Sequence, residues 1–164
     1  MLFWGCGFEG QKLEQQVFRY NEFRNITSLD PAFARNPQNI WPIQQLFNGL
    51  VQLDDSLNIQ PEIARRWEIS SEGTIYTFFL REDVYFHNSP VFGTAKSRTV
   101  TAEDFVFSFD RLQDDQTGSP GGWVLQNVKA YTALDQHTLQ IKLKQAFPAF
   151  LGLLSMRYCA VVRS

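Results

Sequence analysis

Few side chains in this sequence are suited to catalysis or metal binding, and they are widely separated. His87 and His137 are the two histidines, and each lies near a turn signal. A metal site requires His, Cys or carboxylate ligands at short, fixed spacing, which neither histidine has in the sequence. Cys159 lies in an apolar run without a neighbouring base, so we do not expect an activated thiolate there. The sequence therefore predicts neither a metal site nor a bound cofactor.

Three pairs of adjacent carboxylates are the remaining candidates for acid–base chemistry, at positions 54–55, 103–104 and 114–115. Neighbouring side chains diverge on helices and strands alike, so such pairs seldom form a catalytic dyad. The sequence also contains no G-x-S-x-G, no H-E-x-x-H and no phosphate-binding glycine loop. We predict that the chain is not an enzyme. A hydrolase whose site lies outside these motifs is the less favoured alternative.

The composition is that of one globular domain. The chain has 164 residues, a formal net charge of -2 and 44% hydrophobic residues, which is enough apolar material for a single core. The near-neutral charge argues against nucleic acid as a partner, because phosphate binding requires a clustered excess of Lys and Arg. No apolar stretch reaches the roughly 18 residues of a transmembrane helix.

The first residues are apolar up to Cys6, and polar residues follow through Gln16. This order resembles the end of a bacterial lipoprotein signal, in which the cysteine after a short apolar run and a small residue receives the lipid. The basic start and longer apolar stretch of a complete signal are missing. We interpret residues 1–16 as a truncated signal end and a tether, with Cys6 as the lipidation candidate. A simple apolar N-terminus and a disulfide between Cys6 and Cys159 remain open.

The hydrophobic pattern predicts short strands and helices in the first half of the chain. Residues 17–20 form a β-type run and are the expected first strand. From Pro42, apolar residues follow helical spacing through Leu50, and Pro42 suits the first turn of a helix. A second short helix is expected over residues 61–67. We expect Trp67, at its end, to be deeply buried between this helix and the strands that follow.

Two hairpins are predicted from β-type runs around turn residues. The first joins residues 67–69 to 74–80, and the second joins residues 128–133 to 138–143. A further short strand is expected over residues 84–86. Alternation of apolar and polar residues in the last strand of the second hairpin indicates that one face of that strand is exposed to water.

The remaining pattern adds two helices and a terminal strand. Thr101 is a typical N-cap residue, and Asp104 three places later completes an acidic variant of the capping box. A short apolar helix is expected over residues 147–154, and a strand is expected from Met156 on. The predicted fold class is therefore α+β, with a mixed sheet, hairpins and short helices.

Six segments, taken in chain order, resemble the solute-binding proteins of family 5, the group that binds oligopeptides, dipeptides or nickel. The six segments are residues 28–31, 46–50, 61–69, 71–81, 84–87 and 100–105. The first of them reads S-L-D-P, as in the family. Residues 139–150 also resemble the family. Each segment alone is a weak signal, whereas six in one order are specific. Two departures are Arg66, where the family commonly has Ser, and the missing Gly before Pro90.

The resemblance implies a two-lobed protein that closes on a hinge around a peptide or small solute and delivers it to an ABC permease in the membrane. Residues 17–48 would form the first segment of the ligand-binding lobe and residues 49–164 an accessory domain, so that the chain is an incomplete N-terminal fragment. The implied location is the periplasm or the cell surface, with a lipid anchor as the only membrane contact. The alternative is a structural or interaction lipoprotein module without ligand binding.

The resemblance also implies which residues surround the ligand. In the family, part of the surround comes from the loop after S-L-D-P and another part from a Ser-Pro loop in the accessory domain. The corresponding loops here are residues 34–37 and 119–123. The candidate ligand-binding residues are therefore Arg35, Asn36, Pro37 and Trp123. If these loops are simple turns, they carry no function.

Overall fold

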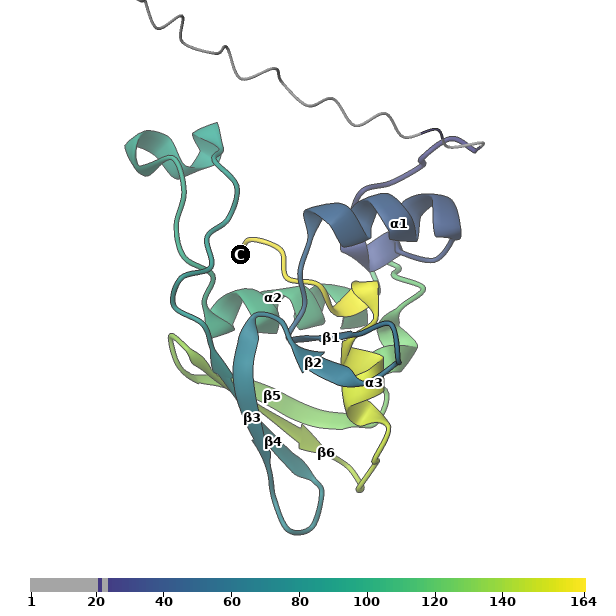
Figure 1. The fold of residues 1–164 in the computed structure, drawn as a ribbon, viewed down its shortest axis with the longest axis vertical. Helices are drawn as coiled ribbons and strands as arrows, with labels where there is room; N and C mark the ends of the chain where they lie inside the picture. Colours follow the sequence, from purple (N-terminus) through teal and green to yellow (C-terminus); the bar gives the residue numbers. More distant parts are fainter. Residues whose placement is uncertain (1–20, 22–23) are drawn as a thin grey trace, which may run out of the picture.

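The computed structural model describes residue 21 and residues 24–164 (Figure 1). The tether and lipidation candidate in residues 1–16, and the strand expected over residues 17–20, lie outside the described residues. In the described part, strands, hairpins and short helices are mixed, so the predicted α+β class is confirmed. None of the described helices is long and apolar enough to cross a membrane.

A four-stranded antiparallel sheet forms the centre of the protein. Its strands, in spatial order, are β3 (Ala64–Ile69), β4 (Ile75–Leu80), β6 (Thr138–Leu143) and β5 (Val128–Asp135). Both predicted hairpins are present, and pairing of β4 with β6 joins them. Every second side chain of β4 and β6 is buried, as a half-buried strand requires. These buried side chains are Tyr76, Phe78, Leu80, Leu139, Ile141 and Leu143.

Helix α2 (Ala102–Gln113) packs against β5 and supplies the second layer of the core. Phe105 and Phe109 are fully buried, and the Phe109 ring meets the Tyr131 ring edge to face at a centroid distance of 5.4 Å. At the start of the helix, the Asp104 carboxylate accepts the Thr101 N–H at 2.9 Å. The predicted capping box is thus confirmed.

Helix α1 (Pro37–Leu46) begins earlier than the predicted start at Pro42. Pro37 occupies the first turn, where its missing N–H costs no helical hydrogen bond. Pro42 instead lies inside the helix and removes one such bond. The predicted start was wrong because Pro42 was assigned to the first turn, whereas Pro37 occupies it and a further turn that includes Ile40 and Trp41 precedes Pro42.

The segment predicted as a second helix is extended instead. Strand β1 (Val51–Leu53) pairs with β2 (Ile59–Pro61), and the chain then enters β3. In β3, Trp67 lies opposite Phe78, and their ring centroids are 6.4 Å apart. Pairing with β4 outweighs the weak helical preference of so short a segment. Trp67 is only partly buried, so the expected deep burial was also wrong.

Two further strand predictions were wrong. Residues 84–86 contribute only a single bridge, between Tyr85 and Thr99. This bridge closes the base of a loop, here called the arm (residues 85–99), which projects from the body of the protein in Figure 1. The terminal run forms the turn η4 (Arg157–Cys159) and then an extended segment that joins neither sheet. The short helix predicted over residues 147–154 is present as α3 (Phe150–Leu154).

Backbone donors attach the terminal segment, residues 160–164, to helix α2. The Val162 N–H donates to Ser108 Oγ at 2.9 Å, and the Ser164 N–H donates to Asp104 Oδ1 at 3.0 Å. Both acceptors are buried side chains of the helix. These bonds replace the ladder that a strand would have formed, which explains why the segment is extended outside a sheet.

The Asp104 carboxylate is fully buried and also accepts two hydrogen bonds of 2.6 Å from the Arg98 guanidinium. Burial alone raises the pKa of Asp104. The hydrogen bonds from Arg98 and from the Ser164 and Thr101 N–H groups outweigh that effect and lower the pKa to about 2. A single carboxylate thus joins the arm, the start of α2 and the terminal segment.

Substitution of this carboxylate by an amide should destabilise the protein in a pH-dependent way. Because breaking a buried pair leaves an uncompensated charge, we expect Asp104→Asn to lower the free energy of unfolding by about 2–4 kcal/mol at pH 7. The folded pKa lies below the unfolded value, so the stabilisation is present above about pH 4 and is lost as pH falls towards 2. The difference in free energy of unfolding between parent and variant should therefore decrease by about 1 kcal/mol from pH 7 to pH 3.

Urea titrations at both pH values measure this gap. Asp115→Asn is the matched control, because Asp115 is an exposed carboxylate of the loop after α2. Its free energy of unfolding should stay within about 0.5 kcal/mol of the parent value. A gap for Asp104→Asn that is constant with pH would contradict the role given to the ionised carboxylate.

The Cys159 thiol should be inert in the folded protein. It is free and fully buried, and burial raises its pKa to about 12. In a Cys6→Ser variant, Cys159 is the one remaining thiol. We expect its reaction with a chromogenic disulfide reagent at pH 8 to be at least about 100-fold slower than in guanidinium chloride. Equal rates in the two conditions would mean that the thiol is accessible.

Candidate functional site

The loop after S-L-D-P is anchored to helix α2 by Asp30. Its carboxylate accepts the Ala32 N–H at 3.0 Å and caps the short turn η1 (Pro31–Phe33). It also pairs with both terminal nitrogens of Arg111, at 2.5 and 3.1 Å. Burial raises the pKa of Asp30, but Arg111 and the Ala32 N–H outweigh burial and lower it. Residues distant in sequence therefore fix the loop that the family resemblance assigns to the ligand.

The second implied loop packs directly on the first. Ser119 Oγ donates to the Ala32 carbonyl at 2.6 Å, and the same oxygen accepts the Gly121 N–H at 3.0 Å. Ala32 lies in η1, just ahead of the implied loop at residues 34–37, so the structure places the second loop against the start of the first. Their adjacency could not be read from the sequence, because nearly ninety positions separate Ser119 from Ala32.

The four candidate residues do not form one cluster. Arg35, Asn36 and Pro37 are exposed and follow each other at the N-terminal end of α1, where Asn36 is the N-cap. Trp123 is also exposed, but it lies in the turn η3 (Gly122–Leu125) and lines a hollow with Phe147. Three of the candidates thus share one end of a helix, and the fourth belongs to a different surface.

Tyr158 is a residue of this junction that the sequence reasoning missed. Its ring lies so close to Gly121 that a Cβ atom at that position would come within 2.4 Å of the ring and clash with it. Both residues are buried. The Gly-Gly pair after Ser-Pro was the one available signal, since adjacent glycines often mark close approach of backbone to another group.

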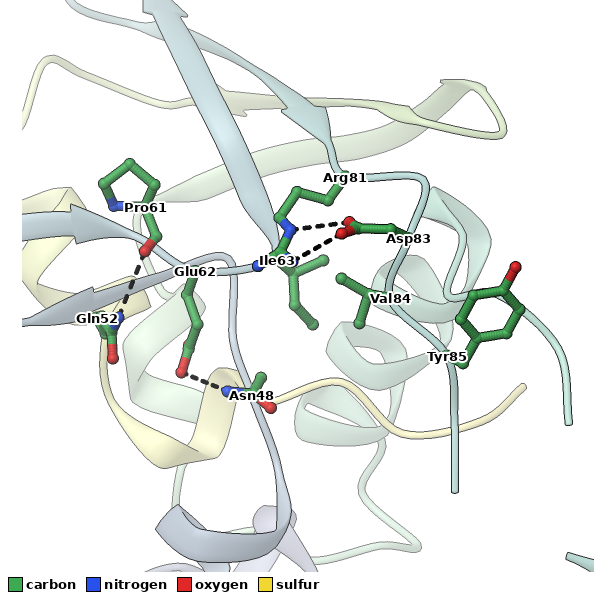
Figure 2. A pocket seen from close by; sticks show the side chains of 9 residues that line it. All are labelled: Asn48, Gln52, Pro61, Glu62, Ile63, Arg81, Asp83, Val84 and Tyr85. Carbon is green, nitrogen blue, oxygen red and sulfur yellow. Dashed lines mark hydrogen bonds and ion pairs between the residues drawn. The ribbon is translucent and has the colours of Figure 1, made fainter. Parts of the chain in front are cut away.

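A polar hollow of about 400 Å³ lies between the end of α1, the β2–β3 connection and the base of the arm (Figure 2). The Glu62 carboxylate, almost fully buried, accepts the Asn48 side-chain amide at 2.8 Å and the Gly49 N–H at 2.6 Å. Arg157 lies 3.4 Å from the same carboxylate. These contacts tie the end of α1 to the turn η4, and sequence reasoning assigned no role to any of them.

The other charged pair of this hollow is Arg81 and Asp83, joined by two hydrogen bonds of 3.0 Å (Figure 2). The hydrogen bond from Arg81 lowers the pKa of Asp83. An apolar hollow of about 250 Å³ adjoins and shares Ile63, Val84 and Tyr85 with it. Because the carboxylates here are held by partners, the geometry suits the recognition of a molecule better than proton transfer.

Metal coordination has no evident place in the described part of the chain. Residue 21 and residues 24–164 contain no group of three or more His, Cys, Asp or Glu side chains that could hold a metal ion. His87 is exposed at the arm, and His137 lies in the β5–β6 turn. The hollows among the described residues are lined mainly by aromatic, aliphatic, amide and charged side chains.

The contact between Gly121 and Tyr158 makes a direct test of how the two loops are held. Gly121→Ala should lower the free energy of unfolding by about 1–3 kcal/mol, because the new methyl group overpacks against the ring. In a Tyr158→Ala background the cost should fall below about 1 kcal/mol. Chemical denaturation of the four proteins of this cycle gives the coupling.

Gly152→Ala is the control for this cycle, because a Cβ atom at that helical position meets nothing within 4 Å. It should leave stability unchanged or raise it by up to about 1 kcal/mol, since alanine favours helix. If Gly121→Ala costs as much without the Tyr158 ring as with it, the close packing described here is not what constrains the loop.

Comparison with known proteins places these features in a family. The sequence model of the bacterial extracellular solute-binding proteins, family 5 (middle), matches residues 58–163. The periplasmic murein peptide-binding protein MppA of Escherichia coli is 36% identical in an alignment of length 143 that covers 77% of this chain and 25% of MppA. The probable deoxycholate-binding periplasmic protein YgiS of Escherichia coli is 33% identical in an alignment of length 158 that covers 86% of this chain and 28% of YgiS.

Solved structures give the same result. The unliganded open form of MppA superposes with a TM-score of 0.73 and 33% identity, covering 84% of this chain and 28% of that one. The Helicobacter pylori protein DppA, in complex with the peptide STSA, superposes with a TM-score of 0.75 and 28% identity, covering 85% and 29%. The chain thus spans little more than a quarter of the length of these relatives. It belongs to the bacterial extracellular solute-binding proteins of family 5.

Proposed function

We propose that this chain is part of the solute-binding component of an ABC-type importer and that the solute is a peptide. The observation that carries the proposal is the junction of the two loops, in which Ser119 holds the Ala32 carbonyl while Arg111 holds Asp30. The junction is interpreted as part of a solute site because the chain belongs to a family in which the corresponding loops surround the ligand. Peptide is favoured as the solute because one solved relative contains the peptide STSA and another relative is named for murein peptides.

In this proposal, residues 17–48 belong to the ligand-binding lobe and residues 49–164 form the accessory domain. Arg35 provides a guanidinium for the carboxylate of a peptide, and Asn36 and Pro37 shape the wall beside it. The Asp30–Arg111 pair is a positioning contact, because it holds the η1 loop against α2. The chain acts by binding and not by chemical turnover, in keeping with the family.

We also propose that the protein works in the periplasm or at the cell surface and passes its solute to a membrane permease. Relatives are named as periplasmic proteins. Cys6, which lies outside the described residues, is the proposed site of a lipid anchor, since an apolar run precedes it and polar residues follow. The upstream reading frame tests this point: a basic and apolar leader supports it, and its absence contradicts it.

The isolated 164-residue chain should bind peptides only weakly. A charged peptide terminus pairs strongly with a protein group only where water is excluded, and one wall leaves the other side of the peptide in water. We expect a Kd no better than about 1 mM, or roughly -4 kcal/mol, for di- to pentapeptides. Titration calorimetry measures it. A micromolar complex would mean that the complete site already lies in these residues.

A hybrid protein tests the role of Arg35 when the opposite wall is present. In this hybrid, the chain replaces the matching quarter of Escherichia coli MppA. We expect peptide affinity at least about 100-fold tighter than that of the isolated chain. Arg35→Ala in the hybrid should weaken binding by at least about tenfold, because a charge-assisted hydrogen bond is lost.

Arg65→Ala, at an exposed position of β3, is the control and should change affinity less than about twofold. A folded hybrid that binds equally well without Arg35 would refute the assignment.

A further inference from the structure

A third hollow, of about 580 Å³, lies between η3, the end of β6 and α3. Its volume is within the roughly 300–1,000 Å³ range typical of small-molecule sites. The residues that line it are Trp123, Val124, Gln126, Asn127, Lys144, Gln145, Phe147 and Leu153. One half of this lining is aromatic and aliphatic, and the other half consists of amides and one ammonium group.

The apolar half contains two aromatic rings that folding leaves exposed. Trp123 is 51% exposed and Phe147 is 37% exposed, whereas Phe78 and Phe150 are fully buried in the core. Exposed aromatic side chains that line one hollow present a broad apolar surface to a ligand. Their presence at the rim of a cavity, instead of singly on a convex surface, favours a binding role.

The polar half is held in place by side chain to backbone hydrogen bonds. Lys144 Nζ donates to the Gln126 carbonyl at 2.6 Å, and Asn127 Nδ2 donates to the Gln145 carbonyl at 2.9 Å. The first bond uses one of the three ammonium donors, so the charge of Lys144 is positioned at the hollow while further donors remain for a ligand. A preorganised cation of this kind lowers the entropy cost of binding an anion.

The charge of the surrounding chain favours an anion as well. Residues 116–164 contain five Lys or Arg side chains and one acidic residue, Asp135, for a net charge of +4. Residues 1–115 contain ten basic and sixteen acidic side chains, for a net charge of -6. No acidic residue occurs in the segments that line the hollow. Glu72 lies in the β3–β4 turn next to Gly73, whose position adjoins Ala146, and its carboxylate is bonded to Ser71.

We propose that this hollow binds an amphipathic anion: an apolar body that lies on Trp123 and Phe147, with a single carboxylate or sulfate on Lys144. Aromatic faces and a fixed ammonium at the two ends of one cavity match the two ends of such a molecule. The hollow takes Trp123 from the end of the second loop, but Arg35, Asp30 and Ser119 are not among the residues that line it. A negative result for this site would therefore not contradict the proposed peptide binding, and the reverse also holds.

Titration of the 164-residue chain with decanoate tests the proposal through tryptophan fluorescence. The chain has four tryptophans, so Trp123→Phe identifies the part of the signal that comes from Trp123. We expect a saturable change that is absent in this variant. Lys144→Gln should weaken decanoate binding at least about tenfold, and Lys144→Arg should restore most of it. Lys142→Gln, at an exposed position of β6 two residues before Lys144, is the matched control and should change affinity less than about twofold.

Octyl glucoside, a neutral amphiphile, separates charge recognition from apolar adsorption. We expect it to bind at least about tenfold more weakly than decanoate, with no effect of Lys144→Gln. Thermal unfolding of each variant confirms that it is folded before it is titrated. Equal binding of the two amphiphiles, decanoate affinity unchanged in a folded Lys144→Gln variant, or a signal that persists in Trp123→Phe would each overturn the proposal.

Discussion

The buried carboxylate of Asp104 accepts hydrogen bonds from Arg98 and Thr101, which are close to it in sequence, and from Ser164, which is 60 positions away. Arg98 brings the base of the arm, Thr101 brings the start of α2, and Ser164 brings the terminal segment. A buried charge without partners is costly, so each of these segments has to be in place for the others to be stable there. The pKa of about 2 reflects how completely the ionised form is satisfied.

A second ion pair, between Asp30 and Arg111, is more exposed than the Asp104 carboxylate. It attaches the η1 loop to α2, as Asp104 attaches the arm. Arg111 belongs to the last turn of α2, and its partner Asp30 belongs to the segment that precedes α1. The helix therefore serves as a common support: its first turn holds the arm and the terminal segment, and its last turn holds the η1 loop. Because Ser119 then joins the η1 loop to the loop after α2, the proposed solute-facing surface is fixed from both sides.

The two proposed binding surfaces differ in the kind of support they have. The loop junction depends on side chain to backbone bonds between distant segments, and Tyr158 fills the space beside Gly121. The hollow at Trp123 is built on the ends of β6 and α3, and its ammonium group is held by a neighbouring carbonyl. Such local support lets the second surface exist in this chain alone, whereas a peptide at the first surface needs an opposite wall to exclude water.

The sequence by itself determined the features that depend on neighbours along the chain. Both hairpins follow from alternation around short turns, and the start of α2 follows from Thr101 and Asp104. Family membership followed from ordered short motifs. By contrast, most of residues 61–67 joined strands because β4 and β1 offered pairing partners, and the terminal run joined no sheet because α2 supplied its acceptors. Local preferences in such short segments are weak, so tertiary contacts decide them.

The same division holds for the candidate site. The sequence indicated the two loops and the candidates Arg35 and Trp123, since these lie in motifs with a recognisable order. Only the tertiary structure decided that Ser119 meets Ala32, that Tyr158 closes on Gly121 and that Trp123 shares a hollow with Phe147 instead of lying beside Arg35. Contacts between residues so far apart in the chain depend on how the core places whole elements, and residue types and spacing do not encode that placement locally.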